Sequence, residues 1–350
     1  MLADKTLLVR ADADPVMGTG HVMRCLALSQ GWQSRGGTVS FVKSTADLDA
    51  RLNTEGFSVH GVNAPAGSLE DAEQTVSLAR RLNASWIVVD GYHFSPEYQH
   101  GLRRSGVPLL TIDDLADARE YGADVLLNQN HYVYPEMYSR RSSHTRLLLG
   151  APYVLLRQEF LKFRDWKRST PKVACRVLVT LGGADPDNVT LRVLETLALN
   201  GWPPLEVIVV AGASNPHTER LQRACLQAGP HFQLKRQVTD MPALMAWADL
   251  AISAGGTTCW ELAFMGLPTA IIILADNQKL VGEVLEGDNV SVNLGWHSGV
   301  TEERLVQMLR PLIEDAGRRR AMSENGRALV DGGGCDRTLH VLTEEFARCA

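Results

Sequence analysis

The sequence predicts an α/β protein built from two doubly wound parallel-sheet domains in tandem. Its length of 350 residues suits two domains of about 150 residues each. Short apolar runs alternate with helical patterns along the chain, which is typical of parallel α/β architecture. A basic, proline-containing stretch at residues 160–175, FLKFRDWKRSTPKVAC, interrupts this alternation and indicates a connection between two domains.

In the first half, apolar runs predict strands and the segments between them predict helices. The helical pattern at residues 22–35 places Val22, Cys25 and Leu26 on one side, as expected for a helix that packs on a sheet. A second helix is expected at residues 69–83. The expected strands are residues 7–11, 39–42, 57–62, 86–90, 109–112 and 125–128.

In the second half, a new alternation begins after residue 175. The expected strands are residues 177–181, 206–211, 232–234, 250–253 and 269–274, and the expected helices are residues 189–199, 219–228, 260–265 and 280–286. A last helix is expected at residues 338–350. We therefore expect an N-terminal domain at residues 1–160, a C-terminal domain at 161–335 and a helical tail at 336–350.

The composition is that of a globular protein, with 45% hydrophobic and 21% charged residues. A net charge of −5 argues against a nucleic-acid surface, which usually carries a basic stripe. The six cysteines are scattered and form no CxxC pair, as expected for free thiols in a reducing compartment. Neither a signal peptide nor an apolar run of ~18 residues is visible. We expect a cytoplasmic protein without a nucleic-acid or membrane partner; the sequence carries no indication of its oligomeric state.

Polar side chains follow several first-half strands where each strand ends. Ligands of doubly wound domains bind at these carboxyl ends, in the cleft between two such domains. Carboxylates, amides and phenols of this kind hydrogen-bond a polar, hydroxylated or amidated small molecule. The candidate substrate-binding residues at this edge are Arg10, Asp12, Gly20, Asp90, Tyr92, Asp113, Asp114, Asn128, Asn130 and Tyr132.

His21 follows the first strand and a loop with two glycines, in RADADPVMGTGHVMRCLALSQ. Gly18 and Gly20 permit a close approach between backbone and ligand. The first turn of a helix lies at the positive end of the helix dipole, which disfavours a protonated imidazole. A neutral imidazole that faces a cleft is a candidate general base. The alternative is a histidine that only caps the helix or packs against it.

The same loop excludes several cofactors. A dinucleotide fingerprint needs a third glycine where this chain has Met23, and an acidic residue where Lys43 closes the second strand. A phosphate-binding GKS or GKT motif is missing from the sequence, and no HxH or HxxxH motif indicates a metal site. We therefore expect neither a cofactor nor a bound metal.

Two glycine-rich turns in the second half have the pattern of an anion site. Backbone amides at a helix N-terminus bind anions, and two such turns suit a diphosphate. In SAGGTTCWELAFMG, Glu261 is placed to accept hydrogen bonds from a ribose diol. Each turn alone could equally be an ordinary strand-to-helix loop. The candidate nucleotide-binding residues are Gly182, Gly183, Asp185, Asn188, Gly255, Gly256, Thr257, Thr258, Glu261, Asn277 and Gln278, with Asp187 or Asn188 as the expected cap of the helix after the first turn.

The second half resembles the nucleotide-sugar half of the GT-B glycosyltransferases, including the transferase that completes the peptidoglycan lipid precursor. The GGTTxxE turn and the following strand that ends in NQ carry this likeness. A longer set of motifs is similar to the UDP-2,4-diacetamido-2,4,6-trideoxy-β-L-altropyranose hydrolases of pseudaminic acid biosynthesis. These motifs run in order from about residue 7 to about residue 335: RADADPVMGTGHVMRCLALS, VVDGYHF, DDLAD, LLNQN, LGAPYVLLRQEF and LGGADPDN.

The resemblance implies two Rossmann-like domains and a metal-independent, inverting hydrolysis at the anomeric carbon that releases UDP. It implies that His21 activates the water, and it adds Arg157, within LGAPYVLLRQEF, to the substrate-binding candidates. Many family members end soon after the DGxGxxR stretch, so residues 339–350 add nothing to this chemistry. The alternatives are a GT-B glycosyltransferase that uses a UDP-sugar donor, a sugar-nucleotide 2-epimerase, and a non-catalytic UDP-sugar sensor.

Overall fold

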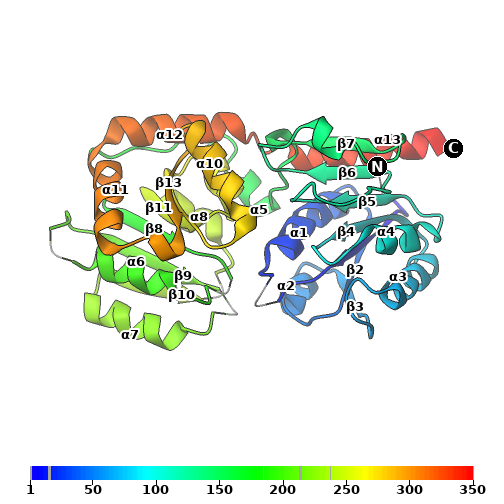
Figure 1. Ribbon diagram of the computed structural model, residues 1–350, viewed down its shortest axis with the longest axis horizontal. Helices are drawn as coiled ribbons and strands as arrows, with labels where there is room; N and C mark the ends of the chain where they lie inside the picture. The colour runs from blue at the N-terminus through cyan, green and yellow to red at the C-terminus, as the bar shows by residue number, and fades with distance from the viewer. Residues whose placement is uncertain are drawn as a thin grey trace. The chain divides into compact units, whose positions relative to one another are not determined.

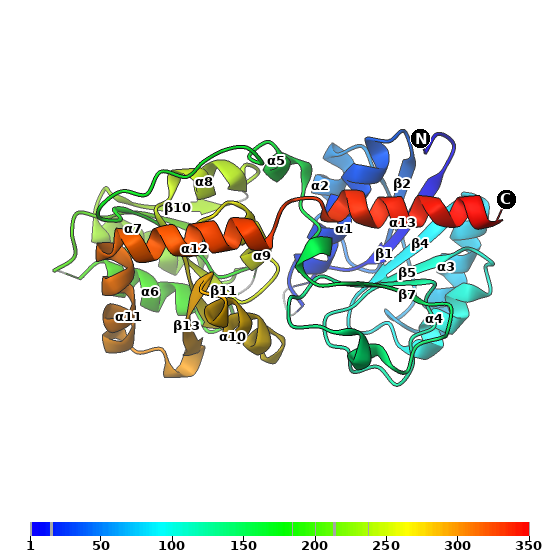
Figure 2. The ribbon, with the colours of Figure 1, turned by 90° about the horizontal axis from the view of Figure 1, so that it is seen from above.

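The computed structural model describes residues 2–14, 17–183, 185–199, 201–212, 215–236 and 238–349, with side chains up to residue 344. It divides into two compact units (Figures 1 and 2). Unit 1 comprises residues 1–158 and 332–350, and unit 2 comprises residues 159–331. The expected boundary at residue 160 lies close to this division. The expected tail at residues 336–350 is not a separate segment, because the chain returns to unit 1 at residue 332. Ala350, the last residue of that tail, lies outside the described residues.

Unit 1 contains a seven-stranded parallel sheet in the order β3-β2-β1-β4-β5-β6-β7. The strands are β1 (Thr6–Ala11), β2 (Thr38–Lys43), β3 (Ser58–Gly61), β4 (Ala84–Asp90), β5 (Leu109–Ile112), β6 (Val125–Asn128) and β7 (Arg146–Leu149). The helices are α1 (Gly20–Gln33), α2 (Asp49–Thr54), α3 (Leu69–Arg81), α4 (Pro96–Arg103), α13 (Gly334–Cys349) and the 3₁₀ turns η1 (Pro135–Tyr138) and η2 (Ala151–Tyr153). The sequence predicted six of these strands and missed β7.

Alternate residues of the central strands pack on opposite faces of this sheet, as the period of a strand requires. Leu7 and Val9 join the core beneath α1 and α13, whereas Leu8 joins the core beneath α3 and α4. Figure 2 shows α13 running beside α1. The buried Leu342 of α13 lies in that core. Helix α13 is therefore a structural part of unit 1.

Unit 2 contains a six-stranded parallel sheet in the order β10-β9-β8-β11-β12-β13. The strands are β8 (Arg176–Thr180), β9 (Glu206–Ala211), β10 (Phe232–Arg236), β11 (Leu250–Ala254), β12 (Thr269–Ile273) and β13 (Ser291–Trp296). The helices are α5 (Gln158–Leu161, across the division), α6 (Val189–Leu197), α7 (Thr218–Ala228), α8 (Met241–Trp247), α9 (Thr258–Phe264), α10 (Lys279–Gly287), α11 (Glu302–Glu314), α12 (Ala316–Leu329) and the 3₁₀ turns η3 (Asp276–Gln278) and η4 (His297–Gly299).

The basic stretch at residues 160–175 belongs to unit 2 and is held there by Arg168. This side chain donates hydrogen bonds to the main-chain oxygens of Met245, Ala248 and Met265. Both units are thus doubly wound parallel sheets, as the sequence predicts.

The packing of α13 on unit 1 can be tested with Leu342→Ala. Leu342 is fully buried, and its main-chain oxygen accepts from the Trp86 indole at 3.1 Å. Truncation leaves a cavity, and we expect a loss of about 2–5 kcal/mol in the free energy of unfolding of unit 1, measured by urea titration. The control Leu226→Ala, at a side chain that is 71% exposed in α7, should change stability by less than ~0.5 kcal/mol. Equal effects of the two substitutions would show that α13 does not stabilise unit 1.

Candidate active site

His21 lies in the first turn of α1, at the carboxyl edge of the unit 1 sheet. Its Nδ1 is 2.7 Å from Oδ1 of Asp90, the last residue of β4. His21 is 5% exposed and Asp90 is fully buried. An ionised carboxylate only accepts hydrogen bonds, so Nδ1 carries a proton and donates it to Asp90. The remaining ring nitrogen, Nε2, then holds the basic lone pair.

Arg24, three residues further along α1, joins two carboxylates. Its Nε and Nη2 donate to the two oxygens of Asp90 at 2.6 Å each, and its Nη1 donates to Asp114 at 2.6 Å. Its Nη2 also lies 3.2 Å from Nδ1 of His21, but the shorter contact with the charged carboxylate decides the tautomer. Burial by itself raises the pKa of Asp90, yet Arg24 and His21 hold that pKa well below its usual range.

The cluster therefore contains two ionised carboxylates that share one buried guanidinium. Sequence analysis did not select Arg24. The available signal was its spacing from His21 in GxGHxxR, because residues three apart share one face of a helix.

Tyr92 and Asn130 complete the cluster around Asp114. The Tyr92 ring stands edge-on to the His21 ring at 4.7 Å, and its hydroxyl donates to Asp114 at 3.4 Å. Asn130 Nδ2 donates to the same carboxylate at 3.1 Å, and the Tyr132 hydroxyl donates to the Asp114 main-chain oxygen at 2.9 Å. Tyr92 is 47% exposed and lies on the solvent side of this cluster. The structure thus brings these sequence candidates together.

Asp113 and Asn128 face inward. The Tyr138 hydroxyl donates to Asp113 at 2.8 Å and accepts from Asn128 Nδ2 at 2.7 Å. Asn128 has no exposed surface, and its Oδ1 accepts from the main chain of Asn130 at 2.9 Å. Burial raises the pKa of Asp113. Asn128 therefore positions the loop that carries Asn130.

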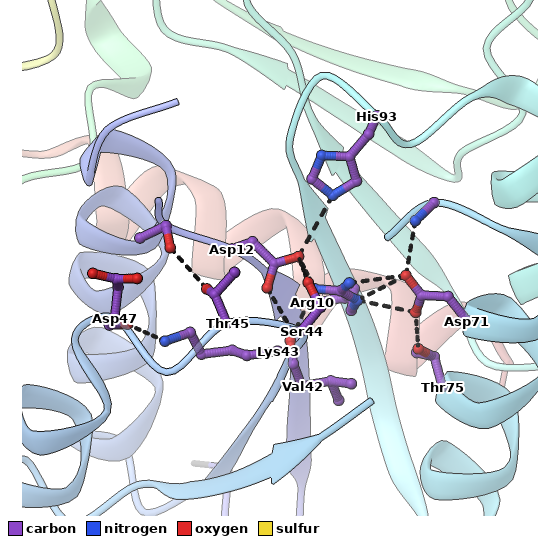
Figure 3. A network of polar contacts seen from close by, with 12 residues as sticks. Arg10, Asp12, Val42, Lys43, Ser44, Thr45, Asp47, Asp71, Thr75 and His93 are labelled. Carbon is purple, nitrogen blue, oxygen red and sulfur yellow. Dashed lines mark hydrogen bonds and ion pairs between the residues drawn. The ribbon is translucent and has the colours of Figure 1, made fainter. Parts of the chain in front are cut away.

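Arg10 and Asp12 belong to a second buried network (Figure 3). Arg10 donates to Asp71 of α3 at 3.0 and 2.8 Å and to Asp12 at 2.6 Å. Asp12 also accepts from the main chain and hydroxyl of Ser44, at 2.7 and 2.8 Å. The expectation that Arg10 contacts substrate is not supported, because its side chain has no exposed surface. This network ties β1 to α3 and to the loop after β2.

The remaining candidates in unit 1 are two glycines of the loop before α1 and Arg157. Gly18 has φ +80°, a conformation that favours glycine, and Gly20 begins α1. Arg157 is 6% exposed and directly precedes α5.

A pocket of about 190 Å³ adjoins the cluster and is lined by His21, Arg24, Asp90, Tyr92, Asp113 and Asp114, together with residues of α4 and β5.

In unit 2, Gly182 and Gly183 follow β8, and Asp185 caps α6. The Asp185 carboxylate accepts from the main-chain nitrogens of Val189 and Thr190 at 2.8 and 2.9 Å. The expectation that Asp187 or Asn188 caps this helix is confirmed for the position of Asn188, but the capping hydrogen bonds come from Asp185. Asn188 occupies the cap position with φ +51°, but its side chain makes no capping hydrogen bond.

The second turn, Gly255 to Thr258, links β11 to α9. An added Cβ at Gly256 would have open space around it, and Glu261 is partly buried in the first turn of α9. Gln278 has a structural contact, because its Oε1 accepts from the main chains of Gly255 and Leu274 at 3.2 and 3.0 Å. Asn277 is exposed in η3. The Gln278 side chain thus connects the turn at Gly255 to the end of β12, a contact that the sequence did not reveal.

Among the described residues, no three His, Cys, Asp or Glu side chains are grouped to hold a metal ion. Within the same part of the chain, no helix has the length and apolar character needed to cross a membrane.

Comparison with known proteins defines the class. Residues 176–331 match the glycosyltransferase family 28 C-terminal domain. The crystal structure of Acinetobacter baumannii MurG superposes with a TM-score of 0.66 at 17% identity, covering 97% of this chain and 99% of that one. Spinosyn rhamnosyltransferase SpnG gives a TM-score of 0.63 at 17% identity, and the superposition covers 96% of this chain and 100% of SpnG. The chain therefore has the GT-B fold, and its second unit matches the family 28 C-terminal domain over residues 176–331.

Two proteins with similar sequences add to the likeness in fold. The chain is 25% identical to the spore coat polysaccharide biosynthesis protein SpsG of Bacillus subtilis over 343 residues, 96% of this chain and 97% of SpsG. It is 30% identical to a Xanthomonas euvesicatoria UDP-N-acetylglucosamine–N-acetylmuramyl-(pentapeptide) pyrophosphoryl-undecaprenol N-acetylglucosamine transferase over 175 residues, 49% of this chain and 40% of the transferase. The protein is thus a GT-B protein related to SpsG along nearly its whole length.

The Asp12 network predicts how the stability of unit 1 depends on pH. Burial raises the pKa of Asp12, but His93, Arg10 and Ser44 hold that pKa well below its usual range. The resulting stabilisation is complete above the unfolded pKa of about 3.9 and is lost as pH falls through the lower folded pKa. Urea unfolding of unit 1 should therefore show stability that declines steeply below pH ~4, with a shallower decline in Asp12→Asn. Asp117→Asn, at an exposed side chain, is the control and should keep the native slope. An unchanged slope in Asp12→Asn would contradict the role of this carboxylate.

Proposed function

We propose that the protein hydrolyses a UDP-diacetamido-trideoxy sugar to the free sugar and UDP. The expected substrate is UDP-2,4-diacetamido-2,4,6-trideoxy-β-L-altropyranose, and the free sugar would enter nonulosonic (pseudaminic) acid biosynthesis. The observation that carries the proposal is the His21–Asp90 pair, which supplies a base of defined tautomer beside a polar pocket. The relation to SpsG, a polysaccharide biosynthesis protein by name, agrees with a role in surface polysaccharides.

The proposed reaction is a single displacement at the anomeric carbon. Nε2 of His21 takes a proton from water as the water oxygen bonds to the carbon. The bond between that carbon and the diphosphate oxygen breaks, and its electron pair leaves with UDP. One displacement inverts the configuration at the carbon. Asp90 stabilises the imidazolium that forms, and Arg24 keeps Asp90 ionised.

Nucleotide binding is assigned to unit 2. The family 28 match covers this unit, and the transferase of Xanthomonas euvesicatoria, which matches about half of the chain, has UDP-N-acetylglucosamine in its name. The backbone amides of the turns after β8 and β11 would bind the diphosphate, and Glu261 would accept from the ribose hydroxyls. Fixed amide dipoles stabilise the departing diphosphate without a metal ion.

The second candidate is a glycosyltransferase with a UDP-sugar donor, favoured by the family 28 match. His21 would then take a proton from an acceptor hydroxyl instead of water. The two candidates differ in one measurable outcome. A hydrolase releases UDP and free sugar from the donor alone, whereas a transferase needs an acceptor for turnover at a comparable rate.

We expect His21→Asn to lower turnover by about 10² to 10⁴, the range for removal of a general base. The asparagine amide still offers a donor to Asp90 but has no basic nitrogen. NMR detection of UDP and free sugar, with excess EDTA and no acceptor, measures the reaction. UDP affinity should be unchanged, and His100→Asn, at an exposed side chain of α4, is the matched control. A folded His21→Asn protein with near-native turnover would contradict the mechanism, and loss of native turnover on chelation would contradict metal independence.

We expect Glu261→Ala to weaken UDP binding by roughly 1.5–3 kcal/mol, the contribution of hydrogen bonds to a charged group. Titration calorimetry with UDP measures the change. Glu195→Ala, at an exposed carboxylate of α6, is the control and should bind UDP as the native protein does. Native affinity in Glu261→Ala would remove this carboxylate from the nucleotide site.

A further inference from the structure

The pocket beside His21 contains two polar groups that the proposed mechanism does not use. Gln99 of α4 and Thr111 of β5 both line this pocket. They are 3% and 6% exposed. Within the described part of the chain, Gln99 Oε1 and Thr111 Oγ1 have no hydrogen-bond partner. A buried polar atom without a partner costs about 1–3 kcal/mol, so such atoms call for a functional explanation.

The orientation of the Gln99 amide is fixed. Its Nε2 donates to the main-chain oxygen of Phe94 at 3.3 Å, which leaves Oε1 as the free end. That oxygen can only accept a hydrogen bond, whereas the Thr111 hydroxyl can donate one. The pair therefore suits a ligand group that has one N–H donor and one carbonyl acceptor.

The rest of the pocket combines apolar walls with four carboxylates, of which three have partners within the protein and the fourth, Asp117, is exposed to solvent. Apolar surface comes from Val89, Phe94, Pro96, Ile112, Leu115 and Ala118. Asp90 and Asp114 are paired with Arg24, and Asp113 accepts from Tyr138 and from the main chain of Ala116. The two unpartnered buried atoms, Gln99 Oε1 and Thr111 Oγ1, are themselves neutral, and the apolar residues of the same pocket suit a methyl group. A secondary amide with a methyl cap fits this combination better than an ammonium ion does.

We propose that Gln99 and Thr111 form a subsite for one acetamido substituent of the sugar. Gln99 Oε1 accepts from the substituent's N–H, and the Thr111 hydroxyl donates to its carbonyl oxygen. The apolar walls cover its methyl group. This inference rests on the proposed function, because it assigns a determinant of substrate choice to the same pocket that contains His21.

The test measures binding and turnover with three ligands and two variants. The ligands are the UDP-diacetamido sugar and its two analogues in which either the 2- or the 4-acetamido group is a free amine. The variants are Thr111→Val, which replaces the hydroxyl by a methyl group of similar shape, and Gln99→Met, which keeps the chain length. Gln227→Met, at an exposed position of α7, is the control. Calorimetry in the His21→Asn background gives affinities without turnover.

The native pocket should prefer the diacetamido sugar over one amine analogue, and each variant should lose about ten-fold of that preference, corresponding to ~1.4 kcal/mol. Affinity for that amine analogue should stay within about two-fold, and the control should match the native protein. Thermal stability should stay equal or rise in Thr111→Val, which removes only an unpartnered polar atom, whereas Gln99→Met also loses the hydrogen bond to the Phe94 main-chain oxygen and should be modestly less stable.

The proposal is overturned if the native pocket binds all three ligands equally or prefers an amine. It is also overturned if the variants weaken acetylated and amine ligands alike. Failure of the proposed function has a different signature, because then the native protein releases no UDP from any of the three sugars, whether or not the binding preference is present.

Discussion

The candidate active site depends on the ion pairs that Arg24 makes with Asp90 and Asp114. Two carboxylates lie beside one imidazole, and a single guanidinium on the same helix as that imidazole pairs with both, which leaves one net negative charge in the cluster. Without this cation, burial would favour protonated carboxyl groups. A protonated Asp90 would offer a donor to Nδ1 of His21, and the proton on the ring would move to Nε2. The basic nitrogen proposed to face the water therefore depends on Arg24.

Within unit 1, the buried polar residues that hold the loops in place differ from the residues that surround His21. The Arg10–Asp12–Asp71 network and the Tyr138–Asp113–Asn128 contacts fix the loops after β1, β2, β5 and β6. The loops after β5 and β6 then present Asp114 and Asn130 near His21, and Tyr92, which follows β4, contacts Asp114 from the solvent side. Two atoms of the residues that line the adjoining pocket, Gln99 Oε1 and Thr111 Oγ1, have no hydrogen-bond partner inside the described protein, as expected where a ligand supplies the missing hydrogen bonds. The candidate binding residues of unit 2 are fewer in kind: two glycine-rich turns and the Glu261 carboxylate on α9.

The sequence predicted the doubly wound fold because most strands are continuous apolar runs. It missed β7, although this strand is as long as β5 and β6, and β13, whose SVNLGW run contains Asn293 and Gly295. It also missed α11, where Pro311 interrupts the helical pattern, and the largely polar α12. The expected helical tail at residues 336–350 coincides, up to residue 349, with α13, whose packing partners in unit 1 are distant in the sequence.

The sequence predicted those members of the cluster that follow a strand or a glycine turn, such as Asp90 and His21, which the structure brings into contact. Partners distant in the sequence were not predictable. Asp71 pairs with Arg10 across 61 residues, and Gln278 pairs with Gly255 across 23. Arg10 therefore resembled a ligand-binding residue, although it is an internal ion-pair partner. The same limit hid Gln99 and Thr111, whose missing partners only the folded chain reveals.

The most direct measurement of the central claim is the site of bond cleavage. The native protein is incubated with the UDP-diacetamido sugar in H₂¹⁸O, and the released UDP is analysed by mass spectrometry. Attack of water at the anomeric carbon breaks the carbon–oxygen bond, so the account predicts UDP without ¹⁸O. The NMR spectrum of the first product formed should show the inverted anomer. UDP that carries ¹⁸O would mean attack at phosphorus, and that result would contradict a base placed at His21 to activate water against the sugar.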